Sequence, residues 1–278
     1  MPSTTPPSLP LTLIVATTPV RVAPPTAFAE HEPSRTTVRL GIGLNGTLPW
    51  PRIKTDMSFF ARVTSRPPVP GTTNAIIMGR KTYFSVPKSL RPLGKRISVV
   101  VTRDQSGSVR ETVLEELLAK KGKMAAKKAE VEAQAPGEGE RLDEEPVTDA
   151  LVTPGLDAAV AELEKGHGKE GSLGKIYVIG GAEIYGATLR LKDEAGSALR
   201  DRPVRIVMTH VVKKPEATGV EEPIECDTFF PVDEFKEEDG WRSASPEEVS
   251  DWVGEKVTGE WIREGDFEVQ MVGYERAR

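Results

Sequence analysis

The sequence of 278 residues lacks the features that mark several classes of protein. It contains a single cysteine, Cys226, which excludes an internal disulfide and a zinc cluster built on cysteines, and suits a reducing compartment. No apolar run approaches the roughly 20 residues that a membrane helix needs. Basic and acidic side chains number 37 and 42, so the strongly positive field that grips nucleic acid is absent. We therefore expect no membrane partner, no nucleic-acid partner and no metal.

The N-terminal apolar run at 9–16 does not read as a secretory signal. No lysine or arginine precedes it, and Pro10 interrupts it. We expect a buried strand there and a protein of the cytoplasm.

Apolar runs and helical patterns alternate along the chain, which predicts an α/β fold with a mostly parallel sheet flanked by helices. The stretch 267–271 alternates apolar and polar residues, as a half-exposed edge or antiparallel strand does. Helical spacing of apolar residues predicts helices over 53–64 and 156–163. The expected buried strands are 11–16, 74–78, 97–102, 175–179 and 204–211.

Two segments look inserted into a single domain that spans 1–278. The stretch 17–39 is rich in proline and polar residues, which predicts a long loop with one short strand at 36–40. The stretch 106–149 begins as a helix through Lys128 and continues as a run rich in glycine and glutamate.

The second insertion has few means of burying itself. From residue 111 to residue 149 it has 6 basic and 11 acidic side chains, which accounts for the net charge of −5, and it has no aromatic residue. Such a composition buries too little apolar area to offset the entropy of ordering, so we expect a surface excursion.

The glycine pattern at 41–46 satisfies G-x-G-x-x-G, but a dinucleotide fingerprint must open a helix. Here Pro49, Trp50 and Pro51 follow, and this sequence does not open a helix. A flexible lid that ends in a rigid aromatic hook is the better interpretation.

Asp56 falls on the apolar stripe of the helix expected over 53–64, with Ile53, Phe60 and Val63. Burial of a carboxylate without a partner is costly, so it should meet a donor-rich ligand, a buried arginine or water. The alternative is an aspartate in the first turn that complements the helix dipole. This pattern leaves both open.

Basic residues follow two of the expected parallel strands. Arg80 and Lys81 come after Gly79, and Thr102 with Arg103 end the next strand. The paired glycines at 180–181 lead from a third strand into a helix. Because α/β sheets bind ligands at the carboxyl ends of their strands, the series indicates a nucleotide with an extra phosphate. The alternative is that basic residues merely flank strands.

Taken in order, these segments resemble dihydrofolate reductase of the eukaryotic branch and suggest its fungal type. No single motif is decisive, but their joint order is highly specific and, apart from the insertions, covers most of the chain. The matching segments are 11–16 (LTLIVA), 41–50 (GIGLNGTLPW), 56–60, 77–87 (IMGRKTYFSVP), 91–97 (RPLGKRI), 100–103 (VVTR), 177–185 (YVIGGAEIY), Thr209 and 227–231 (DTFFP).

The resemblance implies a twisted, eight-stranded, mostly parallel sheet with an antiparallel C-terminal hairpin, flanked by helices. It implies that NADPH reduces 7,8-dihydrofolate to tetrahydrofolate, in support of one-carbon metabolism and of thymidylate and purine synthesis. It further implies a monomer that antifolate inhibitors bind.

The resemblance also assigns the substrate residues. Asp56 would accept hydrogen bonds from the pterin, and Arg96 would clamp the glutamate α-carboxylate with two parallel bonds. Leu48 and Trp50 of the lid would shield the reacting ring and order the water that delivers a proton, since Asp56 should be ionised at neutral pH. The further substrate-binding residues implied are Ile14, Val15, Met57, Phe60, Val86, Pro87, Leu93, Ile179, Tyr185 and Thr209.

The cofactor residues implied by the resemblance gather around the lid and the three strand ends. Thr102 and Arg103 would select NADPH over NADH, and a cis peptide bond would join Gly180 to Gly181. The further cofactor-binding residues are Ala16, Ile42, Gly46, Gly79, Arg80, Lys81, Thr82, Ala182, Glu183 and Ile184.

The sequence departs from the family at the two insertions and at Tyr83, where tryptophan is common. Two rival hypotheses stay open. One is a reductase of the same fold that acts on a ribosylated pyrimidine, although Leu48, Trp50, Asp56 and Arg96 fit it poorly. The other is a catalytically silent scaffold that binds NADPH or folate and presents the second insertion to a partner.

Overall fold

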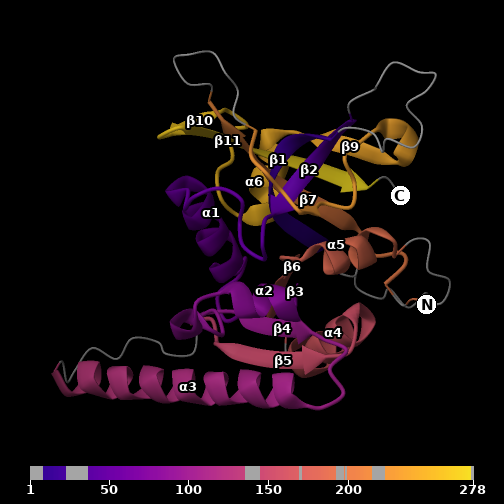
Figure 1. Cartoon of the computed structure of the whole chain (residues 1–278). Coiled ribbons are helices and arrows are strands. Elements are labelled where there is room, and N and C mark those ends of the chain that lie inside the picture. Colours follow the sequence, from indigo (N-terminus) through magenta and orange to yellow (C-terminus); the bar gives the residue numbers. More distant parts are fainter. Residues whose placement is uncertain are drawn as a thin grey trace, which may run out of the picture. The chain divides into compact units, whose positions relative to one another are not determined.

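The computed structural model describes residues 9–22, 37–134, 145–168, 171–191, 197, 199–214 and 223–276. The chain divides into two compact units (Figure 1). Unit 1 contains residues 1–12 and 62–203, and unit 2 contains residues 13–61 and 204–278. Each unit is assembled from segments that are distant in the sequence, and the single domain over 1–278 stays a prediction.

Unit 1 is built on four parallel strands in the order β6-β3-β4-β5. The two inner strands are almost fully buried, as expected of short β-branched runs covered on both faces. The strands are β3 (Thr73–Gly79), β4 (Ile97–Val101), β5 (Asp149–Thr153) and β6 (Leu173–Val178). The helices are α2 (Arg80–Ser85), α3 (Ser108–Gln134), α4 (Leu156–Leu163) and α5 (Ala182–Leu189), with short turns η2 (Lys88–Leu90) and η4 (Glu164–Gly168).

Unit 2 has a row of strands in the order β10-β11-β7-β1, in which β11 is antiparallel to both β10 and β7. Helix α6 (Pro246–Val253) approaches β11 so closely that a Cβ at Gly273 would lie 2.3 Å from Val249 Cγ2. The row consists of β1 (Leu11–Val22), β7 (Val204–Lys213), β10 (Ile262–Glu264) and β11 (Phe267–Arg276), and the accessory strands are β2 (Thr37–Gly43), β8 (Thr228–Phe229) and β9 (Trp241–Ala244). Helix α1 (Lys54–Ser65) begins in unit 2, and its last residues are counted with unit 1.

These two rows, of four strands each, confirm the α/β fold class with a parallel core and antiparallel C-terminal strands. Strand β5 was not among the expected strands. In this strand Ala150 and Val152 are buried, and Asp149 and Leu151 are half-buried. Five residues give too short an alternation to distinguish a strand from the insertion that precedes it.

The expectation of a loop is wrong over 17–22, whereas the short strand expected at 36–40 is confirmed by β2 over its described residues. Strand β1 continues to Val22 and pairs antiparallel with β2, from Thr18 opposite Gly41 to Val22 opposite Thr37. The alternation of Val20 and Val22 with polar residues carried this strand signal, and the proline content obscured it. Residues 23–36 of this insertion lie outside the described residues.

The second insertion is helical for longer than expected, since α3 runs to Gln134. Its first turns are not a surface excursion: Val109, Val113 and Leu117 recur at a spacing of four and are buried. In Figure 1 this helix runs along β5, which it contacts. The later turns, from Lys121 to Glu130, are exposed, and residues 135–144 are outside the described part. No helix of the described residues is both long and apolar enough to cross a bilayer.

Candidate functional site

Asp56 lies in the first turn of α1 and is only 7% exposed. Burial raises the pKa of its carboxyl group, the hydroxyl of Thr209 on β7 lowers it through a hydrogen bond, and the charge of Glu264 raises it further. The structure thus joins two of the predicted site residues, Asp56 and Thr209. It also sets Asp56 on the buried side of the helix, as the apolar stripe predicted.

Glu264, at the end of β10, holds the start of α1 in place. Its Oε1 accepts a hydrogen bond from the backbone N–H of Lys54 at 2.6 Å, and its Oε2 accepts from the N–H and hydroxyl of Thr55 at 2.8 and 2.6 Å. A carboxylate at a helix N-terminus satisfies N–H groups that have no partner in the helix. The first turn, and with it the backbone at Asp56, is therefore fixed by a residue that the sequence analysis missed.

The lid at 44–47 forms a tight turn. Leu44 and Thr47 exchange backbone hydrogen bonds at 2.9 and 3.0 Å, and Gly46 takes a positive φ of 77° that glycine adopts without strain. The N–H of Asn45 donates to Asp227 Oδ2 at 2.8 Å. Beyond the turn, Leu48 is 45% exposed and Trp50 is 5% exposed. Trp50 is therefore the fixed end of the lid, and Leu48 is free to contact a ligand.

The other predicted residues of unit 2 differ in exposure. Met57 is 37% exposed, because the residue after Asp56 on a helix points about 100° away from it. Its proposed contact with substrate stays a prediction. Ile14 and Val15 on β1 are buried. Ala16 on β1, Ile42 on β2 and Phe60 on α1 are half-buried.

In unit 1 the predicted phosphate residues meet at one sheet edge. Gly79 at the end of β3 pairs with Val101 at the end of β4, so Arg80 and Thr102 leave the sheet side by side. Arg80, Lys81 and Arg103 are exposed, and Thr82 and Thr102 are half-buried. This edge presents hydroxyls and cations that suit phosphate groups.

The glycine pair at the end of β6 belongs to the same edge. The N–H of Gly79 donates to the carbonyl of Gly180 at 2.7 Å, and the peptide bond between Gly180 and Gly181 is cis. A Cβ at Gly181 would lie 3.4 Å from Thr82 Oγ1, and one at Gly180 would lie 3.1 Å from the ring of Tyr185. The missing side chains keep this turn open to a ligand.

The residues after the glycine pair include one acidic group. Glu183 of α5 lies 3.4 Å from an Nη of Arg103, and both side chains are 86% exposed. Such an exposed pair contributes little to stability, so Arg103 can turn to a phosphate at little cost. Ala182 and Ile184 are half-buried beside it on α5.

Arg96, just before β4, is a buried cation at 9% exposure. Its Nη1 donates to Thr64 Oγ1 at 2.6 Å and its Nε donates to the carbonyl of Gly94 at 2.9 Å. Burial lowers the pKa of its guanidinium to about 10. These bonds fix the orientation of the guanidinium without neutralising its charge.

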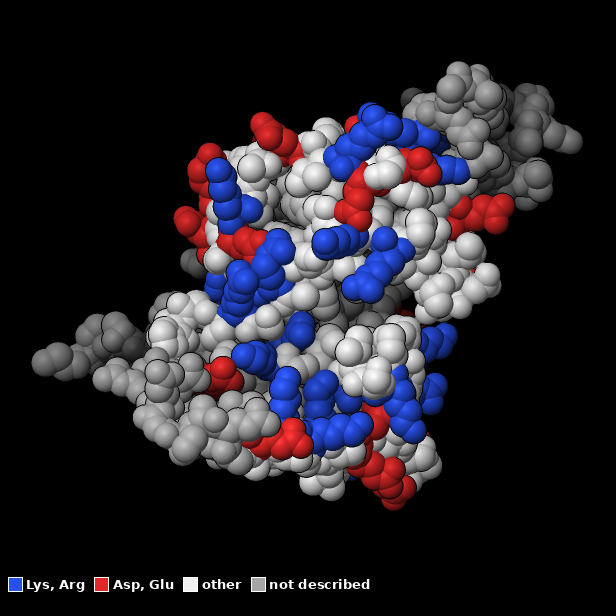
Figure 2. Space-filling model, turned by 90° about the vertical axis from the view of Figure 1, so that its left-hand side faces the viewer, with Lys and Arg blue, Asp and Glu red and all other residues white. Residues whose placement is uncertain are grey.

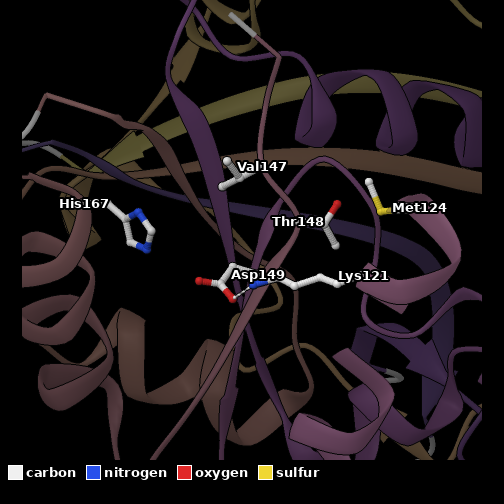
Figure 3. A pocket seen from close by; sticks show the side chains of 6 residues that line it. All are labelled: Lys121, Met124, Val147, Thr148, Asp149 and His167. Atoms are coloured by element: carbon white, nitrogen blue, oxygen red, sulfur yellow. Dashed lines mark hydrogen bonds and ion pairs between the residues drawn. The ribbon is translucent and has the colours of Figure 1, made fainter. Parts of the chain in front are cut away.

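An open pocket of about 420 Å³ lies elsewhere in unit 1 (Figure 3). It is lined by Lys121, Met124, Val147, Thr148, Asp149 and His167. Lys121 Nζ is 3.1 Å from Asp149 Oδ1, so these two charges offset each other. None of the predicted site residues lines it, and it carries no argument for catalysis.

On the face drawn in Figure 2, Lys and Arg side chains are interspersed with Asp and Glu. The expectation of no nucleic-acid partner stays a prediction.

Comparison with known proteins decides the family. Residues 36–135 match the family model described as dihydrofolate reductase. The chain is 31% identical over 199 residues to dihydrofolate reductase of Drosophila melanogaster. The aligned residues cover 71% of this chain and 77% of the relative. The chain belongs to the dihydrofolate reductase family.

Two further members of the dihydrofolate reductase family extend the match. The Pneumocystis carinii enzyme is 30% identical over 245 residues, which is 84% of this chain and 90% of that one. The solved structure of Schistosoma mansoni dihydrofolate reductase has a TM-score of 0.54 at 24% identity and covers 96% of this chain and 98% of that chain, which supports the fold. These comparisons confirm the prediction of an enzyme of the eukaryotic dihydrofolate reductase family. They favour it over the pyrimidine reductase and the scaffold hypotheses.

Proposed function

We propose that the protein reduces 7,8-dihydrofolate to 5,6,7,8-tetrahydrofolate with NADPH. Two buried charges of opposite sign, one in each unit, carry the proposal: Asp56 in unit 2 and Arg96 in unit 1. Within the part of the chain that the structure describes, Asp56 has no cation and Arg96 no carboxylate as partner. Dihydrofolate supplies what both lack, since its pterin presents N–H donors and its glutamate presents carboxylates.

The substrate ring is held by hydrogen bonds to its amino edge. Asp56 accepts from the 2-amino group and N3, and its position is set by Thr209 and Glu264. Ile14, Ile179 and Tyr185 complete the proposed ring site; the pterin of dihydrofolate has a single exocyclic amino group, which Asp56 already holds. Fixed acceptors of this kind supply orientation without reorganisation during the reaction.

The tail of the substrate takes the remaining residues. Arg96 binds the glutamate α-carboxylate through two parallel hydrogen bonds, which its fixed guanidinium favours. Apolar side chains line the p-aminobenzoyl group, as in most small-molecule pockets. These are Phe60, Val86, Pro87 and Leu93.

The residues at the sheet edge of unit 1 fit NADPH. The opening left by Gly180 and Gly181 admits the dinucleotide, and the exposed cations Arg80, Lys81 and Arg103 suit its phosphates. Thr102 and Arg103 hold the 2′-phosphate and so select NADPH. When bound, the cofactor supplies the hydride that C6 of the substrate accepts.

The proton for N5 arrives through water. Asp56 accepts hydrogen bonds from the substrate ring and stabilises the protonated form of that ring. Burial raises the pKa of Asp56 above that of an exposed aspartate, toward neutral pH. Leu48 shields the reacting ring from solvent, anchored by buried Trp50.

The wider role follows from this reaction. The protein supplies tetrahydrofolate for one-carbon metabolism and for thymidylate and purine synthesis. It acts as a cytoplasmic monomer, and antifolate inhibitors compete for the residues around Asp56.

The decisive experiment follows NADPH absorbance at 340 nm with purified protein. NADPH oxidation should depend on added dihydrofolate, and Asp56→Asn should abolish most turnover while NADPH affinity, followed by fluorescence, stays the same. A wild-type protein that binds NADPH without turnover would favour the scaffold instead. Activity with a ribosylated aminopyrimidine and none with dihydrofolate would favour the pyrimidine reductase.

A further inference from the structure

A carboxylate from the inserted helix α3 fastens the segment that follows α2. The Oε2 atom of Glu116 accepts a hydrogen bond from the hydroxyl of Tyr83 at 2.8 Å. Its Oε1 lies 3.1 Å from an Nη of Arg91, and the side chains of Arg91 and Glu116 are only 10% and 9% exposed. One buried acid thereby ties the middle of α2 to the residue that follows η2.

Three further contacts lie beside this fastening. One turn along α3, Lys120 Nζ donates to the carbonyl of Leu90 at 2.8 Å. The guanidinium carbon of Arg91 lies 5.4 Å from the ring centroid of Tyr83 and 5.0 Å from that of Phe84, within range of cation–π attraction. The segment is thus held by polar and charged contacts from α3.

Between α2 and Arg91 the fastened segment has little apolar support. Pro87 and the three residues of η2, Lys88–Leu90, are exposed, so apolar burial contributes little to holding them. Yet the segment carries Val86 and Pro87, and it leads directly to Leu93 and Arg96. These four residues are the ones assigned above to the substrate's tail.

The hydroxyl of Tyr83 is what makes this arrangement possible. Where a tryptophan stood, as is common in the family, its indole would offer an N–H at a different position and no hydroxyl. The aromatic change at 83 and the helix that brings Glu116 are therefore two parts of one contact. The charge on Glu116 also offsets that of Arg91, which would be costly to bury alone.

We propose that Glu116 is a positioning residue for the substrate: by holding Tyr83 and Arg91, it sets the segment 86–96 against the p-aminobenzoylglutamate tail of dihydrofolate. The inference rests on the proposed function. It assigns part of the second insertion to substrate binding, whereas the exposed later turns of α3 take no part in it.

The test compares two substrates in steady-state kinetics with full-length protein. One is dihydrofolate, and the other is 6-methyl-7,8-dihydropterin, which lacks the tail. Glu116→Gln, which keeps the shape and removes the charge, should raise the KM for dihydrofolate about fivefold with kcat within about twofold, because uniform binding is lost. The KM for the tailless pterin should not change. Tyr83→Phe, which removes one hydroxyl, should show the same split at about twofold to threefold.

Glu115→Gln is the matched control, since Glu115 is the exposed neighbour on the same helix and should leave every constant unchanged. Thermal unfolding accompanies each variant, and Tyr83→Phe decides the matter if Glu116→Gln does not fold. An unchanged KM for dihydrofolate, or equal losses with both substrates, would overturn the positioning role while leaving the proposed function intact. A wild-type protein without activity on dihydrofolate would overturn both.

Discussion

Two kinds of buried carboxylate occur in this molecule: one lies against a cation, and the other does not. The contrast distinguishes a group that stabilises the fold from a candidate for ligand binding. Glu116 faces Arg91 at 3.1 Å, so each side chain compensates the burial of the other. Asp56 is equally buried, yet among the described residues it has only the neutral hydroxyl of Thr209 as a hydrogen-bonding side chain, and the like charge of Glu264 acts on it. A charge that folding leaves uncompensated is a charge available to a ligand.

The largest expected effect is on stability, at the compensated pair. Glu116→Ala leaves the guanidinium of Arg91 buried and unpaired, which should lower the free energy of unfolding by about 3–5 kcal/mol. Urea unfolding followed by circular dichroism measures it. Glu115→Ala should stay within about 0.5 kcal/mol of wild type. A loss below about 1 kcal/mol would show that the pair is not structural and would remove the contrast.

The uncompensated acid should show the opposite profile, with a large effect on catalysis. Asp56→Asn should lower kcat/KM for dihydrofolate at least about 100-fold, or roughly 3 kcal/mol of transition-state stabilisation, without loss of stability. The exposed Asp157→Asn serves as control. Parallel losses of activity and stability would make Asp56 a structural residue like Glu116.

Arg96 is the cationic counterpart of Asp56 and sharpens the comparison. Arg96→Lys keeps the charge but cannot form two parallel bonds, so the KM for dihydrofolate should rise about tenfold, equivalent to about 1.4 kcal/mol. The kcat for dihydrofolate and the KM for a pterin without the tail should stay unchanged. A lysine variant with wild-type KM would place the glutamate elsewhere.

The smallest effect concerns pH and the stability cost of Asp56. Its folded pKa is raised above the unfolded one, so between these two values the folded state binds more protons and stability falls as pH rises. Asparagine cannot ionise. Asp56→Asn should therefore stabilise the fold at pH 8, on the order of 1 kcal/mol, and much less near pH 4. Urea titrations of both proteins at several pH values measure the difference, and a gain that grows toward acid pH would contradict the assigned shift.

The sequence predicted most of the strands and helices but few of the contacts that position the candidate site residues. The buried strands β3, β4 and β6 and the helix of Asp56 were predicted because their periodicity is local. Glu264 was not, because it caps Lys54 and Thr55 from far along the chain and no local pattern marks such a partner.

The same reasoning explains the error at the second insertion. Its average composition predicted a solvated excursion, and this describes the late turns of α3 but not the early ones. Val113 and Leu117 are buried on a helix that contacts β5, and β5 itself was missing from the prediction. A composition averaged over a long segment conceals an amphipathic start.

The cap on α1 has a consequence for the order in which the protein matures. The backbone of Lys54 and Thr55 is translated long before Glu264, and all of residues 62–203 emerge in between. On a growing chain the helix that bears Asp56 begins without the Glu264 cap. Unit 1 can therefore fold first, and the first turn of α1 is completed only once the β10–β11 hairpin has formed.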